Sequence, residues 1–407
     1  MGIINQYHMQ FIQSKPIHDF CREQKIAFSQ YHVEDLVEHI NGLVEKGEIS
    51  REVIKEKLDE WIYQGRKKIV FKYLDSDILR SVRHYDNFKA FVEKNFDKSS
   101  EINSILELRA DVDEKTHFID IKYDYNPLNG KMSKAIFLFA KIVRYIKFED
   151  GKGINGLIPI PVHVTIDFEN NEIQARVSAK TYIYDLAGIN KVSELGVAIG
   201  YLQKVLYNLG LNSYMDETDK DILKKAIYKT HERITKLPDE VEKDVDAIGD
   251  EIIEFIKVSA NKLDIRLNNT SSIELANSIK NLFIKELIKK YSSKQKDLFT
   301  RDNFAYSTSI TASGRSLSTL QHSSPSNVPI HSTPEYQNVR TVLDETEIIK
   351  KNTVHWKSII KTNKFLRSKL FIDSKGYGII SFEEYVFEED INHVFSKIRE
   401  SKPPRIV

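Results

Sequence analysis

The hydrophobic pattern of the first 66 residues is typical of helices. Apolar residues recur at steps of three and four and predict a helix over Val33–Glu45, through Leu36, Val37, Ile40, Leu43 and Val44. Gly47 interrupts this stripe, and Ser50 is a suitable N-cap for a second helix that stops at Gly65. The pair fits a helix-turn-helix, but an ordinary helical hairpin is the commoner structure, and no cluster of Arg, Asn and Gln marks the second helix.

Between residues 101 and 185 the period changes to two. Apolar and polar residues alternate in four segments, which are 106–112, 119–123, 162–168 and 173–179. Asn170 and Asn171 tolerate positive φ and suit a two-residue hairpin turn. The pattern predicts an antiparallel sheet with one apolar and one polar face. The mostly apolar segment 135–148 fits either a buried strand or a helix.

The period returns to that of helices over 193–299, where four apolar stripes predict a four-helix cluster. Residues 303–334 then hold 13 Ser and Thr, three prolines and a single charge, Arg315, which predicts a flexible linker. The remaining residues suggest a helix over about 345–363, a hairpin that turns at Lys375-Gly376, and a last helix over about 389–400.

The predicted fold is α+β: an antiparallel sheet domain flanked by helical segments, with a small α+β C-terminal unit on a flexible linker. We expect the following segments: an N-terminal helical segment (1–66), the sheet domain (67–190), the helical cluster (191–299), a Ser/Thr-rich disordered linker (300–339) and the C-terminal unit (340–407).

Composition narrows the class of protein. With 41% hydrophobic and 29% charged residues, the 407-residue chain is not of the disordered, collagenous or membrane-spanning kind. The net charge of +1 does not steer the whole chain toward a polyanion. The single cysteine, Cys21, excludes an internal disulfide and indicates a reducing compartment, so we expect a cytoplasmic protein that has no membrane partner. Abundant Lys, Ile and Asn are typical of AT-rich bacterial genomes, in which such proteins are often encoded in mobile elements or phage-defence loci.

One group of carboxylates has the pattern of a metal-dependent nuclease. Enzymes of the PD-(D/E)xK type place one acid on a strand and an acid-x-lysine on the next, so that two acids hold Mg²⁺ and the lysine activates water. Here Asp111 or Asp113 would be the first acid, Asp120 the second and Lys122 the lysine, with Asp111 and Asp120 as metal ligands. No proline precedes the first acid, and seven to nine residues is a short separation. A solvated sheet face has the same alternating charges.

A cluster of cations in the C-terminal unit suggests a polyanion partner. It contains no acid and comprises Lys350, Lys351, Lys357, Lys361, Lys364, Arg367 and Lys369, with Trp356 interleaved. Lys357, Lys361 and Lys364 have helical spacing, and an aromatic ring could stack on an unpaired base. In the alternative interpretation, this basic helix rests against the acidic residues of 383–390.

Three hypotheses follow. The first is a nucleic-acid-associated binding or adaptor protein that uses the basic helix. The second is a Mg²⁺-dependent nuclease that uses the 111–122 hairpin; apart from its Mg²⁺, no cofactor is expected. The third is assembly with a protein partner, or with further copies of the chain, through helices 193–299, if their apolar stripes exceed what an intramolecular cluster covers.

Overall fold

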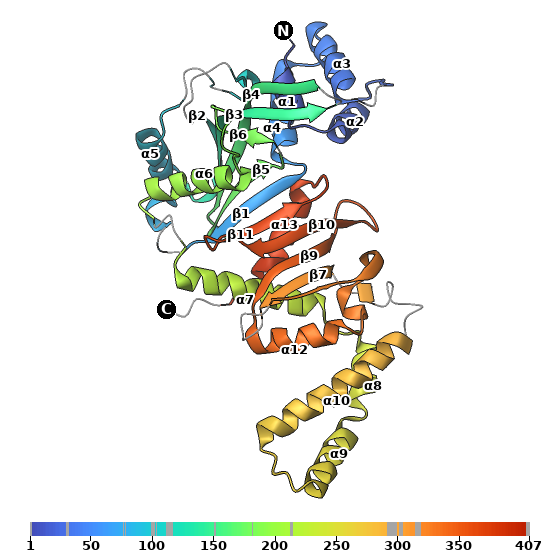
Figure 1. Ribbon diagram of the computed structural model, residues 1–407. Coiled ribbons are helices and arrows are strands. Elements are labelled where there is room, and N and C mark those ends of the chain that lie inside the picture. Colours follow the sequence, from blue (N-terminus) through green and yellow to red (C-terminus); the bar gives the residue numbers. More distant parts are fainter. Residues whose placement is uncertain are drawn as a thin grey trace. The chain divides into compact units, whose positions relative to one another are not determined.

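A computed structural model describes residues 2–403 except 30–31, 76, 78, 99–101, 103, 111–116, 150–151, 181, 212–214, 291–298, 301–303 and 314–318 (Figure 1). The chain forms two compact units. The first comprises Met1–Lys220 and Asp373–Glu388, and the second comprises Asp221–Ile372 and Glu389–Val407. The predicted α+β fold with antiparallel strands and flanking helices is confirmed. The units differ from the five expected segments because each combines residues that are distant in sequence.

The first unit is built on antiparallel strands in the order β2-β3-β4-β5-β1-β11, with the short strand β6 on β3. Their bounds are β1 Lys67–Tyr73, β2 His117–Tyr125, β3 Met132–Glu149, β4 Lys152–Asp167, β5 Glu172–Ser178, β6 Ile183–Tyr184 and β11 Gly378–Phe382. The β4–β5 hairpin turns as predicted, with Asn171 at a φ of 48°. The ambiguous segment 135–148 is a strand, which pairs with β2 and β4.

One predicted strand of this unit is wrong. Residues 106–112 were expected to pair with 119–123, but Ile105–Glu107 form a 3-10 turn (η2) and β2 pairs with β3 instead. Ile105 and Leu108 are buried in an apolar cluster with the N-terminal helices. An alternation of only a few residues does not distinguish a strand from a loop whose apolar side chains enter a core.

Helices cover both faces of this sheet. They are α1 Gln6–Met9, α2 Ser14–Glu23, α3 Val33–Glu45, α4 Arg51–Tyr63, α5 Tyr85–Asn95 and α6 Glu194–Asn208, with the 3-10 turn η1 at Arg80–Val82. α3 and α4 confirm the predicted helical hairpin, and Ser50 accepts a hydrogen bond from the backbone of Val53 at 3.3 Å. α6 packs on β1, β4 and β5, and its Tyr201 donates to the carbonyl of Ala140 on β3 at 2.7 Å.

On β4 and β5, the predicted polar face of the sheet is not a free, solvated surface. His163, Thr165, Gln174 and Arg176 alternate with apolar residues along β4 and β5, as expected, yet each is 5% exposed or less. Tyr63 of α4 reaches this face: its ring lies against His163, and its hydroxyl is 3.2 Å from that of Thr165. The sheet therefore has a buried polar layer beneath α4.

The second unit contains antiparallel strands in the order β10-β9-β7-β8. Their bounds are β7 Ala305–Ser313, β8 Thr319–Ser323, β9 Ile349–Lys357 and β10 Phe365–Ile372. The helices are α7 Glu217–Ile234 (which begins in the first unit), α8 Asp239–Asp246, α9 Gly249–Lys262, α10 Asn269–Lys290, α12 Tyr336–Thr346 and α13 Glu388–Arg399; 3-10 turns lie at Pro325–Asn327 (η4) and Ile330–Ser332 (η5). α13 confirms the last predicted helix. No helix of the described residues is long and apolar enough to cross a membrane.

Three expectations for this unit are corrected. Within the linker predicted over 300–339, Ala305–Ser313 and Thr319–Ser323 are the strands β7 and β8, because apolar residues such as Ala305, Ile310 and Ala312 are buried between the Ser and Thr positions; residues 301–303 and 314–318 lie outside the described residues. The basic helix predicted over 345–363 is the strand β9 and the turn after it. The predicted four-helix cluster is also wrong, because α6 packs on the first sheet whereas α8 and α9 pack on α10.

Candidate functional site

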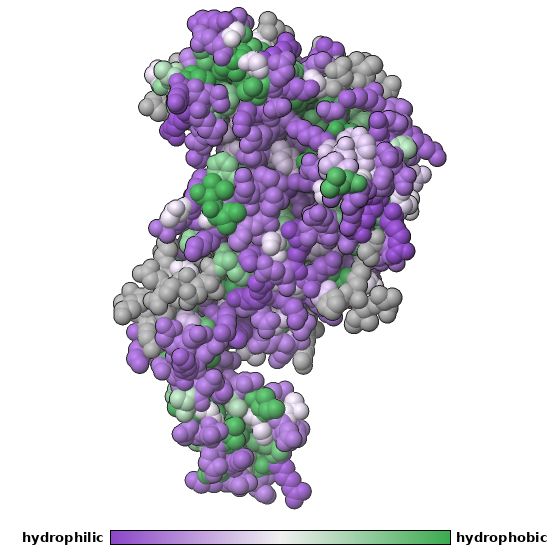
Figure 2. Space-filling model, turned by 180° about the vertical axis from the view of Figure 1, so that it is seen from behind, coloured by the Kyte–Doolittle hydropathy of each residue, from purple (hydrophilic) through white to green (hydrophobic). Residues whose placement is uncertain are grey.

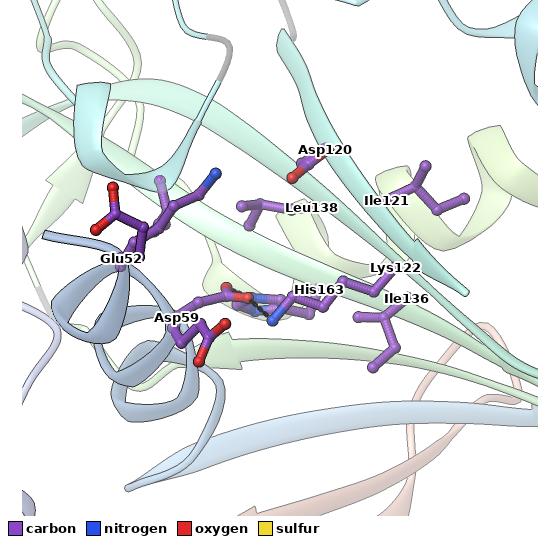
Figure 3. Close-up of a pocket in the computed structure, with 11 residues that line it drawn as sticks. Glu52, Asp59, Asp120, Ile121, Lys122, Ile136, Leu138 and His163 are labelled. Carbon is purple, nitrogen blue, oxygen red and sulfur yellow. Dashed lines mark hydrogen bonds and ion pairs between the residues drawn. The ribbon is translucent and has the colours of Figure 1, made fainter. Parts of the chain in front are cut away.

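A cavity of about 320 Å³ in the first unit lies between α4 and the strands β2, β3 and β4 (Figure 3). Four charged residues of α4 line it at helical spacing, which places them on one face: Glu52, Lys55, Glu56 and Asp59. The sheet contributes Asp120, Ile121, Lys122, Ile136, Leu138 and His163, and Ile105 completes the wall. The cavity lining thus combines apolar side chains with acidic residues and lysines, a composition suited to a small charged or phosphorylated group.

Asp59 is the most strongly held group in this cavity. It accepts a hydrogen bond from Lys122, and its other oxygen lies 3.4 Å from Nε2 of His163. The Asp59 side chain is 13% exposed and that of His163 only 4%. Burial alone would raise the pKa of Asp59, but the interactions with His163 and with the ammonium group of Lys122 outweigh it and lower this pKa to about 2. Asp59 is therefore a carboxylate at neutral pH.

His163 lies next to Asp59, and its burial favours the neutral form of the imidazole. Burial lowers its pKa below the ordinary value, although Asp59 acts in the opposite direction. Tyr63 packs edge-on against the ring with a centroid distance of 4.9 Å. A neutral imidazole that is oriented by a carboxylate can accept a proton, so the Asp59–His163 pair can act as a general base on a group bound in the cavity.

The sequence-predicted pair Asp120 and Lys122 also lines the cavity. Both residues lie on β2 two positions apart, and therefore on the same face of the strand. Asp120 forms an ion pair of 3.1 Å with Lys98, whereas Lys122 contacts Asp59. The other predicted acids, Asp111 and Asp113, lie outside the described residues. Within the described part of the chain, no group of three or more His, Cys, Asp or Glu side chains is arranged to hold a metal ion.

A buried charge network adjoins the cavity on the same face of the sheet. Arg176 of β5 is 1% exposed, and its guanidinium donates to Glu388 and lies 4.3 Å from the ring centre of Tyr63. Lys134 contacts Glu388 at 3.2 Å. Sequence reasoning missed Asp59, His163 and this network. The one available signal was the row of charged residues along one face of α4, which marks a face turned toward polar surroundings.

The predicted nucleic-acid-binding residues lie on β9, on β10 and in the turn between them. The pairing of the strands places Lys351, Lys357, Arg367 and Lys369 on one face. Lys351, Lys357 and Arg367 are exposed and Lys369 is partly so. Lys350 lies on the other face and donates to Thr319 at 2.9 Å, and Lys361 and Lys364 belong to the turn after β9.

The predicted stacking role of Trp356 is wrong. This side chain is fully buried and its indole nitrogen donates to Ser368 at 2.8 Å. On the cationic face, Tyr306 stacks on His355 with ring centroids 4.9 Å apart, but both residues are less than 10% exposed. Phe365 and Phe371 also lie on this face and are partly exposed, so the face offers cations and some aromatic surface to a partner.

Neither protein-family models nor curated proteins gave a match to this chain. The geometry of the cavity and of the cationic strand face therefore carries the functional argument.

Proposed function

We propose that this protein binds nucleic acid through the cationic face of β9 and β10, in place of the basic helix expected from the sequence. The observation that carries the proposal is the arrangement of Lys351, Lys357, Arg367 and Lys369 on one face of two paired strands. No acidic residue lies among the strand positions paired on that face. Because the whole chain has a net charge of only +1, this row of cations would attract a polyanion to one place.

The spacing of the cations fits a phosphate backbone. Arg367 and Lys369 are two positions apart, so their Cα atoms are about 6.7 Å apart along the strand. On the neighbouring strand, Lys351 and Lys357 lie about 20 Å apart on either side of this pair, so the whole row is about 20 Å long. Contacts of these cations would be made to phosphates and would carry little base specificity. A cytoplasmic location, as expected from the composition, would give access to such a partner.

Reversing two of these charges should strongly weaken binding. For Lys351→Glu/Lys357→Glu we expect at least a tenfold loss of affinity at about 100 mM salt, because two phosphate contacts become repulsive. The slope of log K against log[salt] should become shallower by about 2 for duplex DNA. Fluorescence anisotropy with labelled duplex and single-stranded oligonucleotides, at several salt concentrations, measures both quantities.

The matched control for this experiment is Lys225→Glu/Lys229→Glu. These exposed lysines lie on α7, away from the cationic face, and their reversal changes the net charge equally. If both double variants lose affinity equally, the attraction is general and the assignment to β9 and β10 is refuted. A wild-type protein that binds no oligonucleotide at low salt refutes the proposal itself.

A second candidate function, Mg²⁺-dependent phosphodiester hydrolysis, is favoured by one specific observation. Asp120 and Lys122 line the same cavity as Asp59. Mg²⁺ is commonly held by one or two carboxylates together with water and substrate phosphates, so fewer than three protein ligands are sufficient. In this arrangement Asp120 and Asp59 would supply hard oxygen ligands, and Lys122 would orient the attacking water.

Substitution of Asp120 separates this function from plain binding. We expect Asp120→Asn to reduce Mg²⁺-dependent cleavage of DNA or RNA at least 100-fold, since a ligand to the ion is lost, while affinity for oligonucleotides remains. Asp124→Asn is the control, because Asp124 is exposed on the same strand but does not line the cavity. Cleavage that persists in EDTA, or in Asp120→Asn, contradicts this second candidate.

A further inference from the structure

The hairpin of α9 and α10 in the second unit exposes an unusual amount of apolar surface. Figure 2 shows hydrophobic side chains gathered on this part of the molecule, at the lower end of the view. Phe255 is 63% exposed, Leu282 59% and Phe283 46%. Together with Ile248, Ile252 and Ile279, these residues line a groove of about 600 Å³ between the two helices, with Glu251 and Glu286 at its border. Apolar surface of this extent is typical of a protein-binding site.

An exposed face of α9, which borders the groove, has a self-complementary order of residues. Glu251, Phe255, Val258 and Lys262 follow one another at steps of four, three and four, so they form a single stripe along the helix. All four are exposed. The stripe begins with an acid, ends with a base and has two apolar side chains between them.

Two such stripes match when the helices run antiparallel. With a twofold axis between Ile256 and Lys257, Glu251 of one helix faces Lys262 of the other, and Phe255 faces Val258. Each pairing then occurs twice, with opposite charges at both ends and apolar contacts in the middle. A parallel arrangement would place like charges together.

We infer that α9 binds α9 of a second copy of this chain, in an antiparallel pair related by a twofold axis. The order of charges along the stripe selects a second copy as the partner, because the stripe of one helix is complementary to the same stripe of an antiparallel helix. Phe255 lies near the centre of the contact, where exposed aromatic residues contribute most to binding. The adjoining groove, lined by Leu282 and Phe283, accommodates the apolar side chains of the opposing helix.

The experiment measures the mass of the full chain by sedimentation equilibrium over a range of concentrations. We expect a monomer–dimer equilibrium that Phe255→Glu shifts to the monomer, with at least a 100-fold increase in Kd. Ile253→Glu is the matched control, since Ile253 is 46% exposed on α9 but lies off the stripe. It should leave Kd within about threefold of the wild type.

A charge exchange tests the antiparallel arrangement. Glu251→Lys alone should weaken the dimer roughly tenfold, because it places like charges together at both ends, and Glu251→Lys/Lys262→Glu should restore it. Both positions are exposed, so the fold is expected to tolerate these changes, which circular dichroism verifies. A wild-type chain that stays monomeric at all concentrations overturns the inference. So does a dimer that is insensitive to Phe255→Glu, or one that the exchange does not restore.

Discussion

At pH 5 the second unit is expected to be about 4 kcal/mol less stable than at pH 7, because two of its buried histidines are held neutral. His231 and His331 are 2% exposed or less. Burial lowers the pKa of each to about 3, and nearby cationic groups, among them Arg340, add to the effect. The hydrogen bonds of His231 agree with a neutral ring: Nε2 lies 2.7 Å from the Tyr336 hydroxyl, and Nδ1 lies 3.1 Å from the Asn352 amide nitrogen.

The direction of the effect follows from proton uptake. In the unfolded chain each histidine titrates near 6.5, so below that pH the unfolded state binds protons that the folded state does not. Protonation therefore favours unfolding, and stability is lost as the pH falls from about 6.5 toward the folded pKa. Between pH 7 and pH 5 each histidine contributes about 2 kcal/mol to this loss.

Urea unfolding at several pH values measures this loss in the free energy of unfolding of the second unit. The chain has two tryptophans, of which Trp61 belongs to the first unit and Trp356 to the second. A Trp61→Phe background leaves the fluorescence of Trp356 as the probe. In this background His331→Phe should halve the loss, because it keeps a ring next to Phe299, whose centroid is 5.1 Å away, and removes one titrating group. An unchanged pH dependence in His331→Phe would contradict the assignment.

The parts of the fold that could be predicted are those whose signal is local. The stripe of α3 is carried by adjacent turns of one helix, and the β4–β5 hairpin by alternation on both sides of Asn170-Asn171. β9 was mistaken for a helix because lysines at helical spacing continue into the turn after the strand. Its alternation of buried Asn352, Val354 and Trp356 had the period of a strand, and pairing with β7 and β10 decides the structure there.

The candidate cavity could be predicted only in part for a related reason. Asp120 and Lys122 are neighbours on one strand, so the sequence shows that they share a face. Asp59 and His163 are 104 residues apart, and no local pattern relates a helix residue to a strand residue at that distance. His163 lies in a segment whose alternating apolar and polar residues predicted a solvated face. In the structure α4 covers that face, so its polar residues are buried.

Glu388→Ala is expected to lower the free energy of unfolding of the first unit by about 3–5 kcal/mol. Arg176 is 1% exposed, and Glu388 is its acidic partner, with a second guanidinium contact at 3.3 Å. Without the carboxylate, the guanidinium would remain buried, and Gln174 would be left to accept its hydrogen bonds. Lys134 would lose the same partner. Urea unfolding followed by Trp61 fluorescence in a Trp356→Phe background measures the change.

Two further variants distinguish the loss of a buried partner from the loss of a surface charge. Glu389→Ala removes an exposed acid from the neighbouring position and should cost less than about 0.5 kcal/mol. Arg176→Met combined with Glu388→Leu should recover much of the stability that Glu388→Ala loses, because no unpaired charge is then left inside. Burial alone would raise the pKa of Glu388, but Arg176 and Lys134 outweigh it and lower this pKa. The contribution of the pair should therefore be complete above about pH 4.5 and decline as the pH falls toward the folded pKa. A loss in Glu388→Ala no larger than that in Glu389→Ala would mean that water reaches Arg176, and that the polar layer beneath α4 is solvated.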